Sequence, residues 1–490
     1  MNLIFPQPLI AVIVPIIGAI IIRFIGEEKT KLRHLVAVSS VSIVFIAVAT
    51  MLPAVLAGNP IEVRLLDLVD GIGIVFRIDA LGMVFGLVSS CLWVFATVYS
   101  IGYMAHEHDQ QNYFVFFVLS CSAAMGVAFA GSLFTLYIFY EYLAICTYPL
   151  VVHAQTPESV KAGIKYISYS LAGGALVFLS IFMIHNLVGT LDFTPGGIMG
   201  SVGADKTMIL TIIFILLIAG FGTKAAIMPL HSWLPGAMVA PTPVSALLHA
   251  VAIVKAGVFG ISRVFFSIYG RELIAELNVT NVLAVFICFT IIVGSFMAIK
   301  QTVLKLRLAY STIGQLGYIT LGILLLNPAG VTGGLIHIIN HAVLKITLFF
   351  CAGMIITVTG KRNLNQLNGI GRQMPLTMLA FAVGALGLMG VVPICGYISK
   401  YYLLTGSLQA GMPVFAYVIL GSSLLNAIYY LPIIANAFFK EGDFVKQPGP
   451  EAPLTMLIPT LVLVLISIVF GLFANYTTIP FIEAVIKTIF

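Results

Sequence analysis

Charged side chains are scarce in this chain of 490 residues, because Asp, Glu, Lys and Arg together make up only 9% of it. Soluble domains carry about 25%. Hydrophobic residues make up 60% of the sequence. This balance excludes a soluble protein, a disordered chain, a coiled coil and a secreted disulfide scaffold. The apolar runs are long and continuous, which argues against a β-barrel with its short alternating strands.

Motifs for covalent chemistry and for cofactor binding are also missing. None of the six cysteines forms a CxxC pair, which argues against zinc, an iron–sulfur cluster or a disulfide framework. There is no Walker loop, and Gly71-Ile-Gly73 does not complete a dinucleotide fingerprint. The cluster His106-Glu-His108 is interpreted as a solvated loop rather than a metal site. We therefore expect no catalytic site, cofactor or metal in this chain, and no nucleic-acid partner despite the net charge of +6.

Apolar runs of about 20 residues predict roughly fourteen transmembrane helices. The chain is therefore expected to be an all-α polytopic membrane protein with a single domain over residues 1–490. The first run reaches Arg23 without a small-residue cleavage site, so no signal peptide is expected. A short interfacial helix is expected from Thr477 to Phe490. The predicted spans are 4–24, 34–57, 78–102, 112–130, 132–152, 161–187, 207–229, 241–267, 278–299, 308–327, 332–357, 375–405, 411–438 and 453–474.

The distribution of basic residues predicts orientation. Fourteen Lys and Arg residues follow the odd-numbered helices, and six lie on the other side. The positive-inside rule then places both termini on the non-cytoplasmic side of the cell membrane.

The remaining four lysines, which fall inside hydrophobic segments, are Lys224, Lys255, Lys345 and Lys400. Only one carboxylate, Glu141, lies deep within a predicted span, so these lysines cannot all form simple ion pairs. A buried charge costs a few kcal/mol and usually has a function or a partner. The alternative is a lysine that snorkels from a helix end, which applies best to Lys400.

Histidines accompany these lysines. His337, His341 and Lys345 are spaced i, i+4, i+8 on the eleventh helix and share one face. Three aligned titratable groups within lipid favour a proton relay over a set of core histidines bonded to carbonyls. His249 and Lys255 lie on the eighth helix, but their spacing of six does not place them on one face.

Prolines interrupt two of the predicted helices. Pro229, Pro235, Pro241 and Pro243 cannot lie in one unbroken helix, and His231 is among them. Gly390-Val-Val-Pro393 repeats the pattern before Lys400. Backbone groups freed in this way must face protein or water, and such broken helices mark ion pathways in transporters. The alternative is a simple proline kink.

An internal repeat is also indicated. Lys161-Ala-Gly-Ile-Lys165, at the start of the sixth helix, is similar to the glycine-led start of the eleventh. Residues 112–267 and 278–438 are predicted to form two five-helix units, and an odd helix number makes them inverted in the membrane.

The chain resembles the antiporter-like proton-translocating subunits of complex I, of Mrp cation/proton antiporters and of energy-converting membrane-bound hydrogenases. The segment that carries the resemblance is His231-Ser-Trp-Leu-Pro-Gly-Ala-Met-Val-Ala-Pro-Thr-Pro-Val-Ser-Ala-Leu-Leu-His-Ala250, followed by Lys255-Ala-Gly. Tyr99-Ser-Ile-Gly-Tyr-Met104 is a second similar stretch. The resemblance implies fourteen helices, two inverted five-helix units and broken helices seven and twelve.

The resemblance also implies roles for single residues. Glu141 corresponds to a glutamate that pairs with a lysine, here Lys224, and Lys255 to the central relay lysine. His337 and His341 correspond to connecting groups, and Lys400 to the terminal group. His231, His249, Lys345 and Lys165 are expected to support this pathway.

The sequence departs from the family pattern at Tyr140, where many members have Trp, and at Gly236, where Asp is common. Thr147-Tyr-Pro-Leu150 is closer to the Mrp and hydrogenase members. The expected function is proton, or sodium/proton, translocation as a subunit of a redox-driven complex, with other membrane subunits and the lipid bilayer as partners. The alternatives are a D-like component of an Mrp-type Na+/H+ antiporter and a stand-alone solute transporter.

Overall fold

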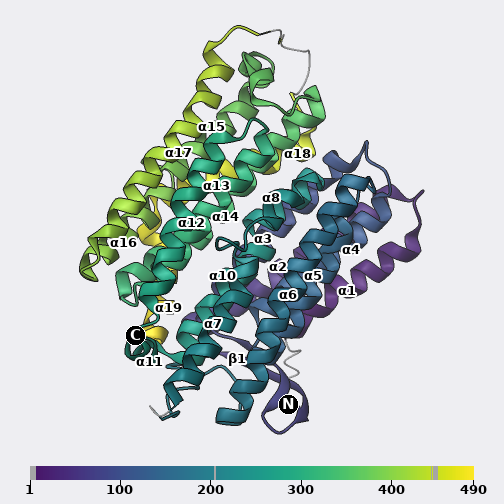
Figure 1. Cartoon of the computed structure of the whole chain (residues 1–490). Coiled ribbons are helices and arrows are strands. Elements are labelled where there is room, and N and C mark those ends of the chain that lie inside the picture. Colours follow the sequence, from purple (N-terminus) through teal and green to yellow (C-terminus); the bar gives the residue numbers. More distant parts are fainter. Residues whose placement is uncertain (1–6, 204–205, 443, 445–450) are drawn as a thin grey trace.

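A computed structural model of the chain describes residues 7–203, 206–442, 444 and 451–490. Long apolar helices dominate it, as the continuous hydrophobic runs predict. Figure 1 shows these helices running roughly parallel, with α1, α4, α5 and α6 on one side and α12, α16 and α17 on the other. The helices are α1 (Gln7–Ile25), α2 (Thr30–Leu56), α3 (Ala80–Met104), α4 (Gln110–Ala128), α5 (Leu133–Val151), α6 (Pro157–Val188), α7 (Thr207–Lys224), α8 (Trp233–Gly236), α9 (Thr242–Ala250), α10 (Ile253–Arg263), α11 (Arg271–Leu277), α12 (Thr280–Lys300), α13 (Leu304–Leu324), α14 (Pro328–Thr359), α15 (Pro375–Met389), α16 (Gly396–Gln409), α17 (Pro413–Phe439), α18 (Leu454–Leu472) and α19 (Thr478–Ile489).

Twelve helical segments of the described chain are long and apolar enough to cross a membrane. The chain is therefore a multi-span membrane protein. The predicted spans agree with the helices to within a few residues, although residues 4–6 of the first predicted span lie outside the described ranges. The predicted helix near the C-terminus is present as α19.

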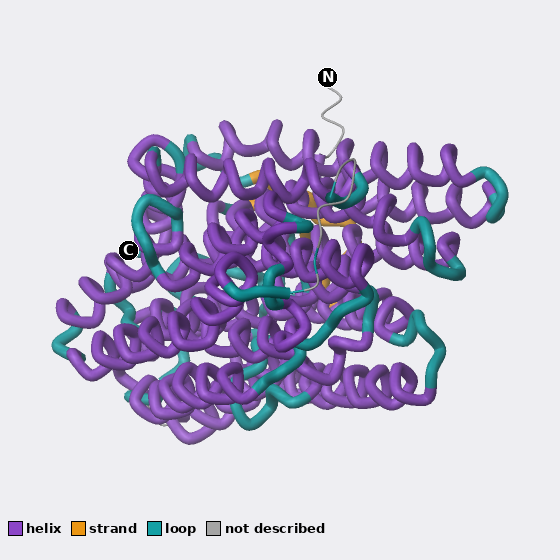
Figure 2. The backbone as a smooth tube through the Cα atoms, turned by 90° about the horizontal axis from the view of Figure 1, so that it is seen from above, coloured by secondary structure: helices purple, strands orange, loops and turns teal. Residues whose placement is uncertain are grey.

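The all-α expectation is wrong in one place. Strands β1 (Ile61–Val69) and β2 (Ile72–Ile78) form an antiparallel hairpin between α2 and α3. Figure 2 shows that the strands occupy one small part of an otherwise helical molecule. The hairpin joins the loop before α5, because Arg77 N donates to Phe129 O at 2.7 Å and Gly131 N donates to Val75 O at 2.8 Å. It therefore marks one end of the bundle, and α3 and α5 both run from it toward the opposite end.

Three interruptions break the helices near the centre of the molecule. The chain leaves helical geometry between α7 and α8 and between α15 and α16, which confirms the breaks expected from the prolines. A third interruption, at Val251 and Ala252 between α9 and α10, contradicts the continuous helix predicted over 241–267. No Pro or Gly is present at this point, so nothing in the local sequence signals it.

The most deeply buried span is Thr242–Tyr269, which contains the third interruption. It ends in a π-helical turn, Val264–Tyr269. The long helix α14 is also largely buried and packs against α9, α13 and α16. The backbone of the third interruption thus lies in the protein interior, where lipid does not reach it and protein groups can satisfy it. Residues 391–393, in the interruption between α15 and α16, are exposed.

Candidate functional site

The carboxylate of Glu141 on α5 faces the end of α7. Its Oε1 lies 4.0 Å from Nζ of Lys224, the last residue of α7. The Lys224 ammonium donates to the backbone carbonyl of Tyr140 and lies 3.3 Å from the centre of the Tyr140 ring. Neither carboxylate oxygen of Glu141 has a hydrogen-bond partner among the described residues. Charge alone therefore holds this carboxylate beside the buried ammonium, and the pair can separate without breaking a hydrogen bond.

Gly174 on α6 provides the space for that carboxylate. A Cβ atom at this position would lie 2.2 Å from Oε1 of Glu141, far inside van der Waals contact. The absence of a side chain here is therefore a condition for the Glu141–Lys224 pair.

Neighbouring side chains and backbone groups pack against the interruption after Lys224. The indole Nε1 of buried Trp233 donates to the carbonyl of Thr223 at 2.8 Å, in addition to the bond that this carbonyl accepts from Ala226 N at 3.2 Å. On the other side, Gly257 of α10 lies so close that a Cβ would be 2.3 Å from the Ala225 nitrogen. Helix α10 therefore packs directly on the backbone that follows Lys224.

Lys255 lies in the first turn of α10, directly after the third interruption. Its Nζ is 2.9 Å from Nδ1 of His341 on α14, and both side chains are buried. A charged ammonium only donates, so this contact requires either Lys255 to donate to a neutral imidazole or a neutral Lys255 to accept from His341. The two groups are therefore placed to exchange one proton.

His337 continues the contact along α14. Its ring centre lies 5.9 Å from that of His341. Nδ1 of His337 is 2.8 Å from Oγ of Ser399 on α16, and Nε2 is 3.0 Å from Oε1 of Gln315 on α13. Both ring nitrogens have partners that can orient the imidazole.

Lys400 on α16 lies beyond a tyrosine. The ring of Tyr318 is 5.4 Å from the ring of His337, and the Lys400 ammonium is 5.7 Å from the centre of the Tyr318 ring. Lys400 donates to the carbonyl of Met389, the last residue of α15, and to Oγ of Ser423, each at 2.8 Å. Lys400 thus contacts the carbonyl end of the helix before the second break, whereas Lys224 ends the helix before the first break and contacts α5.

We call the side chains of Lys255, His341, His337, Tyr318 and Lys400 the polar row. Each member lies beside the next through the contacts given above, and all five are buried. A buried sequence of groups that can each accept or release a proton is suited to moving charge through a membrane interior.

Lys345, predicted to support the row, lies on the same helix but points to other partners. Its Nζ donates to the carbonyl of Leu308 at 2.9 Å, to the hydroxyl of Tyr430 at 3.2 Å, and to Oγ of Ser311. Three acceptors match the three donors of an ammonium group. This environment is suited to a lysine that holds α13, α14 and α17 together.

The other three predicted supporting residues differ in position. His249 is fully buried against Phe349, and neither ring nitrogen has a partner in the described structure. His231 lies in the interruption after α7, with its ring 6.5 Å from that of Tyr310. Lys165 is exposed on α6.

Comparison with known proteins assigns this architecture to a family. The family model described as "NADH:quinone oxidoreductase/Mrp antiporter, TM" matches residues 130–426. A second model, described as "NADH-Ubiquinone oxidoreductase (complex I), chain 5 N-terminus", matches residues 71–114. The chain belongs to the NADH:quinone oxidoreductase/Mrp antiporter family.

Individual relatives come from both branches of this family. NADH-quinone oxidoreductase subunit N of Desulforudis audaxviator is 31% identical over 95% of this chain and 95% of its own length. A Na(+)/H(+) antiporter subunit of Bacillus subtilis is 25% identical over 98% of this chain and 96% of its own length. A chain of the Mrp complex from Dietzia sp. DQ12-45-1b has the same fold, with a TM-score of 0.90 at 22% identity over 100% of this chain and 98% of that one.

The NADH:quinone oxidoreductase/Mrp antiporter region 130–426 contains every predicted site residue and also Tyr318. Sequence reasoning missed Tyr318, although a signal was present: Gln315 and Tyr318 are three residues apart, so they share a face of an apolar helix. Lys305 was also missed. Its position in the sequence predicts a loop residue, but it is largely buried and donates to the carbonyl of Ala240 at 2.7 Å.

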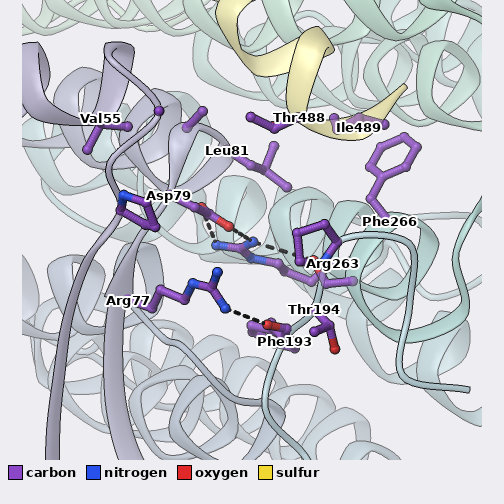
Figure 3. A pocket seen from close by; sticks show the side chains of 15 residues that line it. Val55, Arg77, Asp79, Leu81, Phe193, Thr194, Arg263, Phe266, Thr488 and Ile489 are labelled. Carbon is purple, nitrogen blue, oxygen red and sulfur yellow. Dashed lines mark hydrogen bonds and ion pairs between the residues drawn. The ribbon is translucent and has the colours of Figure 1, made fainter.

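A second charged pair, with Arg263 buried and the Asp79 side chain 32% exposed, lies at the hairpin end of the molecule. Arg263 donates through Nη2 to Oδ1 of Asp79 at 2.8 Å and through Nη1 to Oδ2 at 2.5 Å. Figure 3 shows both residues, with Arg77, around a cavity of about 200 Å³. Burial would raise the pKa of Asp79, but the Arg263 guanidinium outweighs it and holds this pKa below its usual range. Arg263 is counted with the six basic residues outside the hydrophobic segments, but it is a buried cation in addition to the four lysines.

Metal ligands do not gather anywhere in the described part of the chain. No group of three or more His, Cys, Asp or Glu side chains there could hold a metal ion.

Proposed function

We propose that this chain is a proton-translocating subunit of a redox-driven multisubunit membrane complex, and that protons move along the polar row. The observation that carries the proposal is the contact of Lys255 with His341 and the continuation of that contact through His337 and Tyr318 to Lys400. The similarity to a quinone oxidoreductase subunit N over nearly the whole chain supports the redox-driven parent complex.

In this mechanism the Glu141–Lys224 pair controls when a proton enters the polar row. With Glu141 close by, a charged Lys224 is stabilised in its buried site, because an opposite charge compensates for lost hydration. When the pair opens, the charge on Lys224 loses that compensation and its proton passes toward Lys255. His341 and His337 then carry the proton toward Lys400.

The energy for this step must come from outside the chain. Moving one charge against 100 mV requires about 2.3 kcal/mol. Partner subunits of the complex would supply it by changing the distance between Glu141 and Lys224.

The proposal includes the finer architecture expected from the sequence. We assign fourteen membrane-crossing helices, with the pairs α9–α10 and α15–α16 each counted as one. Residues 112–267 and 278–438 are the two inverted five-helix repeats, and both termini lie on the non-cytoplasmic side. The two broken helices have similar positions in the two halves of the chain, and each has a lysine near its break. Helix α7 ends in Lys224, and Lys400 lies on α16, after the second break. These similarities support the repeat.

The test uses the complete complex in native membrane vesicles. We expect Lys224→Ala and Glu141→Ala to abolish donor-driven acidification, measured with a pH-sensitive dye, while Lys161→Ala on the exposed side of α6 leaves it unchanged. Full proton movement in Lys224→Ala, with the complex assembled, would overturn the proposal.

A second candidate is a component of an Mrp-type Na+/H+ antiporter, which the similarity to the Bacillus subtilis antiporter chain over 98% of this sequence favours. The two candidates differ in their energy source. Proton movement that needs an electron donor supports the first, and proton movement driven by a sodium gradient without a donor supports the second. Mass spectrometry of the native complex identifies the partner subunits and would exclude a stand-alone transporter if partners are found.

A further inference from the structure

A cavity of about 210 Å³ lies at the end of the bundle opposite the hairpin. It is formed where α4 begins and α5 ends, and its lining includes Asp109, Asn112, Tyr113, Leu150 and His153. Its volume exceeds that of several water molecules, each of which occupies about 30 Å³ in the liquid. Its polar lining is suited to water.

A histidine pair stands at this cavity. Nε2 of His108, on the loop before α4, lies 2.9 Å from the carbonyl oxygen of His153, and the two rings stack with centres 4.7 Å apart. His108 is exposed to solvent, whereas His153 is only 7% exposed and lines the cavity. Nε2 of His153 has no partner among the described residues. An exposed imidazole thus stacks on a buried one that has a free nitrogen.

The charges around His153 favour its neutral form. Burial and the neighbouring His108 lower its pKa, and the acidic groups Asp109 and Glu107 oppose them only in part. Tyr113 packs edge-on against the ring, and its hydroxyl is 2.8 Å from Oγ of Ser100. A neutral imidazole with a free nitrogen can accept a proton.

A second, smaller cavity continues inward. It measures about 10 Å³, roughly the space that one water needs. Leu150 lines both cavities. Most of the second cavity is apolar, and its two hydroxyl groups belong to Ser120 and Thr147; the apolar lining residues are Trp93, Phe117, Val244, Leu247, Leu248 and Ala252. Leu150 is therefore the narrow point between them.

Two routes lead from the second cavity to the lysines of the proposed pathway. Ala252 belongs to the interruption that directly precedes the helix of Lys255. The hydroxyl of Thr147 is 2.6 Å from that of Tyr166, whose ring lies 5.3 Å from that of Trp233, the first residue of α8. The two cavities thus lie between the solvent-exposed loops and the segments that interrupt both helices.

We propose that these two cavities are the inlet through which protons reach Lys224 and Lys255, with His153 as the proton-accepting residue and Leu150 as the constriction. This inference rests on the proposed function. His153 takes a proton on its buried Nε2 when water in the outer cavity reaches that atom. It releases the proton past Leu150 to a single water beside the hydroxyls of Ser120 and Thr147, which returns the imidazole to its neutral form.

The test compares His153→Gln with His106→Gln, which changes an exposed histidine of the same loop region, in the complete complex in native membranes. We expect His153→Gln to slow proton movement at least about tenfold, since loss of a positioned proton-transfer group costs about 10²–10⁴-fold. The wild-type rate should also follow a titration with a midpoint below about 6.5, the ordinary value for histidine. That titration should be absent in His153→Gln and present in His106→Gln.

Cysteine labelling provides a second measurement that does not depend on His153. Leu150→Cys should react with a small water-soluble methanethiosulfonate, and the reaction should block proton movement. Leu136→Cys, buried on the same helix but outside both cavities, should remain unreactive. An unlabelled Leu150→Cys together with an unchanged pH profile in His153→Gln would overturn the inlet.

The same experiment separates this inference from the proposed function. If Lys224→Ala stops proton movement while the His153 and Leu150 variants behave as wild type, the inlet is wrong and the polar row stands. If Lys224→Ala has no effect either, both proposals fail.

Discussion

Nζ of Lys255 lies 2.9 Å from Nδ1 of His341, and this contact joins the helix after the third interruption to the longest buried helix, α14. One of the two groups must be neutral for the hydrogen bond to exist. The hydrogen bond therefore places one proton between two helices, and the proposed relay requires both residues for this step.

A double-mutant cycle tests this joint role. We expect Lys255→Met and His341→Gln each to reduce the rate of proton movement by about 100-fold or more, the order of loss for a proton-transfer group. The double variant should be no slower than the slower single variant, because residues that act as a unit are not additive. Losses that multiply would show that the two residues act independently.

Gly174→Ala tests the geometry of the Glu141–Lys224 pair without changing either charge. The added methyl group would lie 2.2 Å from Oε1 of Glu141, so the carboxylate must move. We expect proton movement to fall by up to about 100-fold, as misplacement of a reacting group by about 1 Å can cause. The rate in vesicles is the measurement.

Gly421→Ala is the matched control. Gly421 lies on α17, and a Cβ there meets nothing within 4 Å. An alanine in a helix is slightly more stable than a glycine, so this variant should assemble and pump as wild type. Equal rates for the two alanine variants would contradict the steric role of Gly174.

Asp79→Asn should destabilise the fold, because it leaves the buried Arg263 guanidinium without its negative partner. Removing one member of a fully buried pair costs about 3–5 kcal/mol. Because the Asp79 side chain is 32% exposed, we expect a smaller loss of about 1–3 kcal/mol. Asp67→Asn, which affects an exposed pair with Arg64, should cost no more than about 1 kcal/mol. Thermal unfolding of the purified protein in detergent measures both.

The Asp79 pair also predicts an acid limit to stability. The pKa of Asp79 is lower in the folded state than in the unfolded chain, so its contribution is complete above the unfolded value of about 3.9. The contribution is lost as the pH falls through the lower folded pKa. Asp79→Asn should lose this part of the pH dependence, and an unchanged acid unfolding curve would contradict the assignment.

The sequence predicts the helices well because each membrane span requires its own long apolar run. It also predicts the two proline-rich interruptions and most of the polar row, since a lysine or histidine within such a run is conspicuous. The hairpin was missed although Asp70-Gly71 lies between two alternating segments, a strong hairpin signal. Its strands are short and amphipathic, so they differ little from a polar loop in a search for long apolar runs.

Other features depend on tertiary contacts that no local pattern contains. The interruption at Val251 and Ala252 has no proline or glycine, and packing against neighbouring helices determines it. Lys305 and Arg263 lie near helix ends, where a basic residue is normally solvated, and only their burial in the structure distinguishes them. Orientation and subunit partners involve the membrane and other chains, so they stay predictions.

Trp233→Phe tests whether the hydrogen bond from Trp233 to the end of α7 positions Lys224. The change keeps an aromatic ring but removes the indole donor to the carbonyl of Thr223. The Thr223 carbonyl keeps its bond from Ala226 N at 3.2 Å, so the variant loses one hydrogen bond, worth about 0.5–1.5 kcal/mol, and both thermal stability and the rate of proton movement should fall. Tyr269→Phe is the matched control, because its buried hydroxyl donates to the carbonyl of Leu210 near the other end of the same helix. It should lose similar stability but retain the wild-type rate, since Leu210 is fourteen residues from Lys224 along α7. Equal losses of rate in the two variants would show that general loosening of α7, and not the position of Lys224, limits proton movement.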